Sequence, residues 1–159
     1  MNCCCPSRCC RVDRMAFSNP SLEEIRALLE RVRTIAVVGL SPKTDRPSFK
    51  VASALQRFGY RIVPVRPMAK EILGEKVYPD LASVPEPIDL VDVFRAPEQV
   101  DEVIDACIAR QVPAVWLQDG VVNEAAALRA RAAGLMVVMD RCVYRDYVQL
   151  FGAAPRSAP

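Results

Sequence analysis

The stretch TIAVVGLSPKTDRPSFKVA, residues 34–52, holds a strand, a turn and the beginning of a helix. Its continuous apolar and β-branched residues predict a buried strand over 34–39. We expect the helix that follows to cover 48–58 and to end at Gly59. A strand that passes through a glycine turn into a helix is typical of α/β folds with a ligand at the turn. No second glycine follows Gly39 before Gly59, so the glycine cluster that cradles a dinucleotide is missing.

The alternation of strand and helix continues along the chain. The first helix begins at a capping box formed by Ser21 and Glu24, and Asn123 is an expected helix cap. The segment 66–87 is predicted to be a loop with short turns and a small helix near 81–84. Further strands are predicted at 60–65, 88–94, 113–118 and 135–140, and further helices at 21–32, 97–111, 123–134 and 143–151. The pattern predicts an α/β, three-layer domain with a five-stranded, mostly parallel sheet and helices on both faces.

A length of 159 residues, 52% of them hydrophobic, fits one domain. We assign 20–151 to this domain, 1–19 to a disordered Cys-rich extension and 152–159 to a disordered tail. Such closely spaced cysteines suit neither a disulfide framework nor the usual paired zinc spacing. We therefore interpret them as an extension that precedes a start at Met15, with a thiolate zinc site and lipidation as the alternatives. The clustered cysteines are Cys3, Cys4, Cys5, Cys9 and Cys10.

Composition removes several classes of function. The net charge of +2 is spread along the chain, which gives nucleic-acid binding no support. No apolar run reaches the roughly 18 residues of a membrane helix, and no secretory signal is evident, so we expect a soluble cytoplasmic protein. The chain contains no histidine, which excludes histidine general bases, phosphohistidine intermediates and histidine metal ligands. A protein partner or a homo-oligomer is compatible with the sequence but is not indicated by any feature of it.

The loop after the first strand is the strongest candidate site. Right-handed crossovers place the carboxyl ends of parallel strands on one edge, where ligands bind. Here Lys43 and Arg46 accompany hydroxyl groups, and Pro47 suits the first turn of a helix. The amides of 48–50 would then point outward and add the helix dipole to the side-chain charges. The loop predicts an anion site; the alternative is a solvated basic loop.

The end of the second strand discriminates between ligands. An NAD-selecting fold places an acid there to bind the ribose hydroxyl groups, whereas this chain has Arg66. A guanidinium can pair with a phosphorylated ribose, as in NADP or coenzyme A. The missing glycine cluster counts against NADP. At the next strand end, Phe94 either covers an adenine or completes the core, and Arg95 is a candidate phosphate partner.

The third and fourth strand ends carry fewer charges than the first loop, and the fifth strand runs into Asp140, Arg141 and Cys142. We expect Asp140 to cap the last helix, and Arg141 and Cys142 to face the ligand. Cys142 is a weak candidate nucleophile, because a packed thiol is the commoner role without a neighbouring histidine. Within the third strand, alternation puts Asp89 and Asp92 on different faces, as a strand-edge turn and a helix-facing or structural group.

Four segments together resemble the small stand-alone CoA-binding domain proteins, which are similar to the CoA-binding domain of the succinyl-CoA synthetase α-subunit. They are TIAVVGLSPKTDRPSFKVASALQRFGYRIVPVRP (34–67), ILGEKVYPDLASVPEPIDLVDVFR (72–95), VWLQDGVVNEAAALRARAAGL (115–135) and VVMDRC (137–142). The resemblance covers about 20–150 and implies a Rossmann-like domain that binds coenzyme A along the carboxyl edge of the sheet. The full synthetase uses a phosphohistidine in a second domain, so its ligase chemistry does not transfer to a chain without histidine.

The resemblance also implies a set of cofactor-binding residues at the strand ends. Arg66-Pro67 stands where many relatives carry Asn-Pro, which makes the cation particular to this chain. The residues that match by position are Gly39, Leu40, Ser41, Pro42, Lys43, Arg46, Ser48, Val65, Arg66, Pro67, Phe94, Arg95 and Gln118. We expect no metal and no catalytic residue among them.

The leading hypothesis is therefore a non-catalytic module that binds coenzyme A or an acyl-CoA. The alternative is an enzyme in the same cleft, either NADP-dependent or handling a thioester through Cys142. A structural protein whose nucleotide site has decayed is the third reading.

Overall fold

The computed structural model describes residues 16–156. The cysteine cluster and the predicted start at Met15 lie outside these residues. The centre of the fold is a sheet of five parallel strands in the order β2-β1-β5-β6-β7. Every neighbouring pair in this sheet is parallel, which confirms the predicted α/β architecture. The strands are β1 (Thr34–Val38), β2 (Arg61–Val65), β5 (Leu90–Val93), β6 (Ala114–Leu117) and β7 (Met136–Val138).

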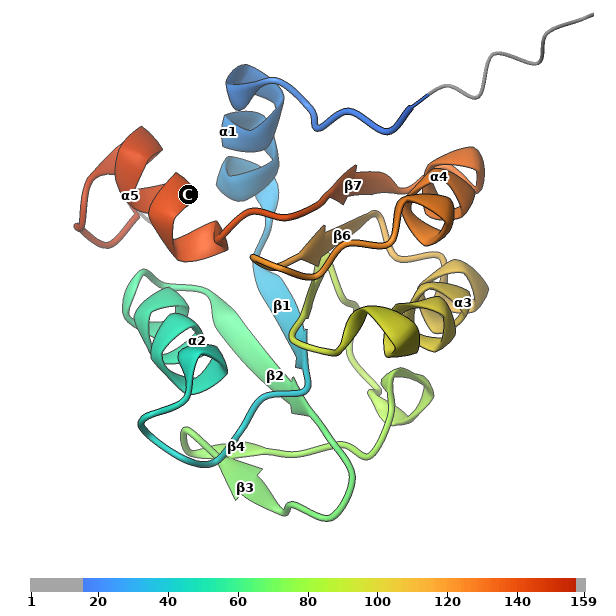
Figure 1. The fold of residues 1–159 in the computed structure, drawn as a ribbon. Helices are drawn as coiled ribbons and strands as arrows, with labels where there is room; N and C mark the ends of the chain where they lie inside the picture. Colours follow the sequence, from blue (N-terminus) through green and yellow to red (C-terminus); the bar gives the residue numbers. More distant parts are fainter. Residues whose placement is uncertain (1–15, 157–159) are drawn as a thin grey trace, which may run out of the picture.

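Helices cover both faces of the sheet, as predicted. In Figure 1, α2 and α5 lie to the left of the sheet and α3 and α4 to the right. The strands supply alternate side chains to two buried clusters, so that Ile35 packs with α1, α2 and α5 while Ala36 packs with α3 and α4. The helices are α1 (Leu22–Arg31), α2 (Pro47–Arg57), α3 (Val100–Arg110), α4 (Glu124–Ala132) and α5 (Val143–Phe151).

The segment between β2 and β5 contains more structure than the sequence pattern predicts. Strands β3 (Glu71–Ile72) and β4 (Glu75–Lys76) form a small antiparallel hairpin, whereas η1 (Leu81–Ser83) is the short helix predicted near 81–84. A second 3₁₀ turn, η2 (Pro97–Gln99), follows β5. Tyr78 continues the pairing onto the outer strand β2, because its N–H donates to Pro64 O at 3.0 Å. Strands of two residues are too short to produce a readable alternation. The hairpin thus covers the β2 edge of the sheet. The sequence pattern could not have predicted it.

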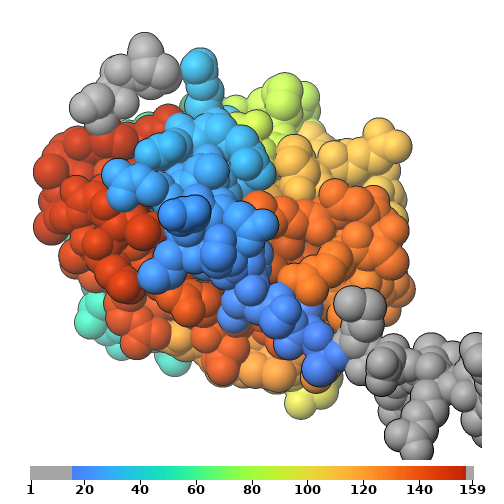
Figure 2. Space-filling model, turned by 90° about the horizontal axis from the view of Figure 1, so that it is seen from above, coloured from blue at the N-terminus to red at the C-terminus, as the bar shows by residue number. Residues whose placement is uncertain are grey.

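Part of the segment assigned to the N-terminal extension packs on the domain. The side-chain amide of Asn19 exchanges two hydrogen bonds with the backbone of Met139, at 2.8 and 2.9 Å. The Phe17 N–H donates to Glu124 of α4 at 2.8 Å, and the Arg131 guanidinium lies over the Phe17 ring. Figure 2 shows this segment and α1 between α5 and the region of α4 and β7. The Asn19 hydrogen bonds satisfy the backbone N–H and C=O of Met139, the residue that follows β7 directly.

The first residues of the predicted C-terminal tail are also anchored. The Arg156 N–H donates to Phe58 O at 3.1 Å, its guanidinium donates to Leu29 O at 3.2 Å, and the same group lies 4.6 Å from the centre of the Tyr60 ring. The Tyr147 hydroxyl donates to Ala154 O at 2.9 Å. The tail as far as Arg156 therefore forms coil that is held against α1 and α2.

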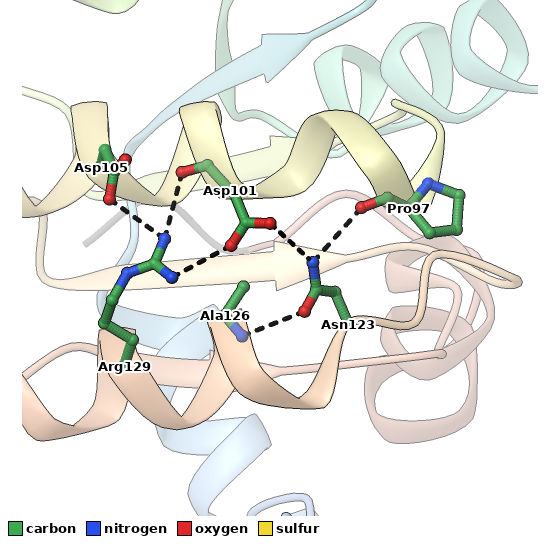
Figure 3. Close-up of polar contacts among 6 residues, drawn as sticks. All are labelled: Pro97, Asp101, Asp105, Asn123, Ala126 and Arg129. Atoms are coloured by element: carbon green, nitrogen blue, oxygen red, sulfur yellow. Dashed lines mark hydrogen bonds and ion pairs between the residues drawn. The ribbon is translucent and has the colours of Figure 1, made fainter.

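A polar network joins α3 to α4 (Figure 3). Arg129 donates to the carboxylates of Asp101 and Asp105, at 3.0 Å each. Asn123 accepts from the Ala126 N–H at 3.1 Å, which confirms it as the cap of α4. The predicted capping box of α1 is present as well. Because Asn123 also donates to Pro97 O at 3.3 Å, the network fixes the segment that follows β6 beside the one that follows β5.

Candidate functional site

The carboxyl ends of the strands enclose a cleft of about 790 Å³. Residues from the ends of β1, β2, β5 and β6 and from the start of α5 meet there. The lining residues are Gly39, Ser41, Pro42, Lys43, Arg46, Pro47, Ser48, Val51, Arg66, Phe94, Arg95, Gln118, Asp119, Val121 and Cys142. The edge predicted from the parallel strands is thus a concave surface.

Gly39 sets the direction in which the chain leaves β1. Its φ of +84° is a conformation that side chains other than glycine rarely adopt, and its N–H donates to Val65 O at 2.9 Å. A β-carbon at this position would lie 2.3 Å from Phe94 O. The glycine is therefore required by the close approach of the β5 end rather than by a glycine-rich phosphate turn.

The loop after Gly39 is closed by hydroxyl groups. Ser48 Oγ accepts from the Ser41 N–H at 3.0 Å, and Ser41 Oγ accepts from the Lys43 N–H at 3.2 Å. Both hydroxyls keep a proton that can be donated to a ligand. Ser48 lies in the first turn of α2 and is only 5% exposed, so its position is fixed by packing.

Pro47 occupies the first turn of α2, as predicted, and the N–H groups of Ser48 and Phe49 have no acceptor among residues 16–156. The Lys50 N–H is different, because it donates to Arg46 O at 3.1 Å. The prediction of three free amides is therefore wrong for Lys50, whose N–H is already the first intrahelical donor. Two free amides and the helix dipole still favour an anion at this end of α2.

The charges that line the cleft are mostly positive. Lys43, Arg46, Arg66 and Arg95 are cationic, and the single acid is Asp119. Asp119 pairs with Arg145 of α5, which offsets its charge. The guanidinium of Arg66 donates to Leu40 O at 3.4 Å. This long hydrogen bond links the end of β2 to the loop after β1. A bound anion would find several donors within one cleft.

The structure brings most of the predicted site residues together, but three do not line the cleft. Leu40 is fully buried and Val65 is 3% exposed, so both belong to the core and contribute only through their backbone carbonyls. Pro67 lines an adjacent smaller cavity of about 340 Å³ instead. Phe94 lines both cavities and also packs against the core, so both of its predicted roles are compatible with its place.

Several lining residues were not predicted as binding residues. Pro47 and Val51 are four residues apart on α2 and so lie on the same face of the helix. Once Pro47 was placed at the cleft, this spacing could have predicted Val51 as a lining residue. Val121 gives no such signal, because a buried valine in a turn looks like core. Asp119 and Cys142 were considered at the sequence level but left out of the binding set.

The segment between β7 and α5 differs from the prediction in two respects. Asp140 does not cap α5; its Oδ1 accepts from the Gly120 N–H at 2.8 Å, and Cys142 occupies the cap position without a side-chain bond. Arg141 does not line the cleft, because its guanidinium forms two hydrogen bonds with Asp146, at 2.7 and 2.8 Å. This carboxylate raises the pKa of Arg141. Of this segment, only Cys142 reaches the cleft, as predicted.

The two aspartates of the third strand have the distinct environments that alternation predicted. Asp89 Oδ2 accepts from the N–H groups of Arg33 and Thr34, at 3.0 and 2.9 Å, and so closes the turn into β1. Asp92 is fully buried, and its Oδ1 accepts from Gln118 Nε2 at 2.6 Å. Burial raises the pKa of Asp92 to about 7.

The part of the chain that the structure describes contains neither a metal-binding cluster nor a membrane-spanning helix. Residues 16–156 contain no group of three or more cysteine or acidic side chains placed to hold a metal ion. No helix in the same range has the length and apolarity needed to cross a membrane.

Comparison with known proteins identifies relatives of the whole domain. The CoA binding domain family matches residues 33–147. The protein YneT of Bacillus subtilis is 43% identical over 127 residues, which is 80% of this chain and 94% of that protein. The ADP-forming acetate–CoA ligase II of Archaeoglobus fulgidus is 30% identical over 95 residues, 58% of this chain but only 14% of the ligase. A solved structure of a hypothetical protein from Pyrococcus horikoshii superposes with a TM-score of 0.81 at 36% identity, over 87% of this chain and all of that one (100%).

Proposed function

The chain belongs to the CoA binding domain family, and on that premise we propose that it binds coenzyme A or an acyl-CoA in the cleft at the carboxyl edge of the sheet. The observation that carries the proposal is the cationic lining of this cleft, in which Arg66 follows β2 while Lys43 and Arg46 follow β1. Coenzyme A has phosphate at two separated points, the ribose 3′-position and the pyrophosphate. Two separated groups of cations match that arrangement.

The strand order suggests how the ligand would lie. Arg66 at the outer strand β2 would take the ribose 3′-phosphate, and the free amides of α2 with Arg46 would take the pyrophosphate. The adenine would enter the smaller cavity beside Phe94 and Pro67. The pantetheine arm would then run over the ends of β5 and β6 towards Cys142.

We propose a binding role without catalysis. The chain has no histidine, and Arg141 and Asp146 are engaged with each other. The alternative is a thioester-handling enzyme, which is favoured by one observation: Cys142 lines the cleft at the end that the arm would reach. It ranks second because the chain has no histidine to activate the thiol.

Arg66 gives the sharpest test of the ligand. Arg66→Ala is expected to weaken CoA by about 1.5–3 kcal/mol, the range for a hydrogen bond to a charged group. Dephospho-CoA lacks the 3′-phosphate, so its affinity should barely change. Isothermal titration calorimetry with both ligands measures the difference.

Arg46→Ala is the matched control for this experiment. Both ligands carry the pyrophosphate, so the loss of Arg46 should weaken both of them. Equal losses for CoA and dephospho-CoA in the Arg66→Ala protein would contradict the assignment of Arg66 to the 3′-phosphate.

A further inference from the structure

A buried polar pair lies under the cleft at the ends of β5 and β6. Asp92 is 0% exposed and stands beside Val37 and Trp116 on the neighbouring strands. Gln118 is 3% exposed, follows β6 directly and lines the cleft. The two side chains are joined at 2.6 Å, from Gln118 Nε2 to Asp92 Oδ1. Gln118 therefore connects a fully buried carboxyl group to the surface where the ligand is proposed to lie.

The carboxyl group is unusual within residues 16–156. Its Oδ2 is the single buried side-chain oxygen or nitrogen of that range without a hydrogen-bond partner. A buried polar atom left without a partner costs about 1–3 kcal/mol, so a hydrophobic side chain would serve packing better. The position beside Val37 and Trp116 is otherwise apolar. Packing alone gives no reason for an acid at this place.

The pair determines which end of the Gln118 amide faces the ligand. An ionised carboxylate only accepts hydrogen bonds, so the NH₂ group must turn towards Asp92. Gln118 Oε1 accepts no hydrogen bond from the described residues, and it is not among their buried atoms that lack a partner. It is therefore accessible from the cleft, where it offers an acceptor.

We propose that Asp92 is a positioning residue, which holds Gln118 so that Gln118 Oε1 accepts a hydrogen bond from an amide N–H of the pantetheine arm. This inference rests on the proposed function and adds a specificity determinant to it. The phosphates of the ligand are recognised by cations, whereas the arm carries no charge and needs a directed hydrogen bond. Without the carboxylate, no contact among the described residues keeps Gln118 Oε1 turned towards the arm.

The test compares CoA with adenosine 3′,5′-bisphosphate, which has the phosphorylated ribose but no pantetheine arm. Titrations are run at pH 8, where Asp92 is ionised because its pKa is about 7. Asp92→Leu should weaken CoA about tenfold, the effect of one hydrogen bond, and leave the bisphosphate unchanged. Asp92→Asn keeps an acceptor for Gln118 Nε2 and should restore CoA affinity to within about threefold of the original protein.

A double-mutant cycle separates positioning from a structural role. Gln118→Met should weaken CoA about tenfold, and Asp92→Leu should have no further effect in that background. Equal losses for both ligands in Asp92→Leu, or additive losses in the double variant, would overturn the inference. Should Asp92→Leu fail to melt cooperatively, a Gln118→Met protein that binds both ligands normally would overturn it instead. Failure of the unmodified protein to bind either ligand would overturn the proposed function itself.

Discussion

Gly39→Ala is expected to lower the free energy of unfolding by about 2–5 kcal/mol. The first contribution is backbone strain, since φ at Gly39 is +84° and a left-handed conformation costs a residue with a β-carbon about 1–2 kcal/mol. The second is overlap, because the new carbon would lie 2.3 Å from Phe94 O and 3.1 Å from Phe94 C. Both atoms are backbone, so β1 and β5 must move apart, at about 1–3 kcal/mol for an overpacked site. Urea denaturation measures the loss.

Gly134→Ala is the matched control for the overlap. Its φ is +93°, so the strain is similar, but no atom lies within 4 Å of the added carbon. We expect this variant to lose about 1–2 kcal/mol. Equal losses in the two variants would show that the approach of Phe94 to Gly39 is not what requires the glycine.

Asp92 is expected to make the protein less stable as the pH rises from about 4 to about 7. Its pKa is raised by burial from 3.8 to about 7, so within this window the folded state binds a proton that the unfolded state has lost. The stabilisation is complete below the unfolded pKa and is lost as the pH passes the folded pKa. At about 1.4 kcal/mol for each of about three pKa units, the loss is roughly 4 kcal/mol.

The difference between the unmodified protein and Asp92→Asn isolates this effect. Hydrogen bonds lower the pKa of Asp80 and of Glu86, and these groups change the stability in the opposite sense in both proteins. The free energy of unfolding of the unmodified protein, minus that of Asp92→Asn, should fall between about pH 4 and about pH 7 and level off above this range. A flat difference would mean that Asp92 is hydrated in the folded protein and titrates like an exposed acid.

The parallel sheet and the place of the cleft could be predicted because they depend on local patterns. Apolar runs such as 34–39 and 88–94 mark buried parallel strands, and helical spacing between them marks the crossovers. Once the strands are parallel, their carboxyl ends share an edge. Gly39, Arg66 and Gln118 therefore had to lie near one another, although they are far apart in the sequence.

The parts that could not be predicted depend on contacts between distant segments. The hydrogen bond between Asp92 and Gln118 requires the register of β5 against β6, which no single strand encodes. Asp140 looked like a helix cap, but its left-handed backbone turns the side chain towards Gly120. The sequence around Asn19 gives no sign that its side chain bonds the backbone of Met139.

The proposed ligand of the cleft is tested most directly by calorimetric titration of the unmodified protein with CoA, NADP and NAD. All three contain an adenosine and a pyrophosphate, whereas NAD lacks the extra ribose phosphate, and NADP and NAD need the glycine-rich turn that this chain lacks. We expect CoA to bind at micromolar concentrations, NADP to bind more weakly and NAD to bind weakest. Absence of heat with CoA at high micromolar concentrations, or tighter binding of NADP than of CoA, would contradict the account.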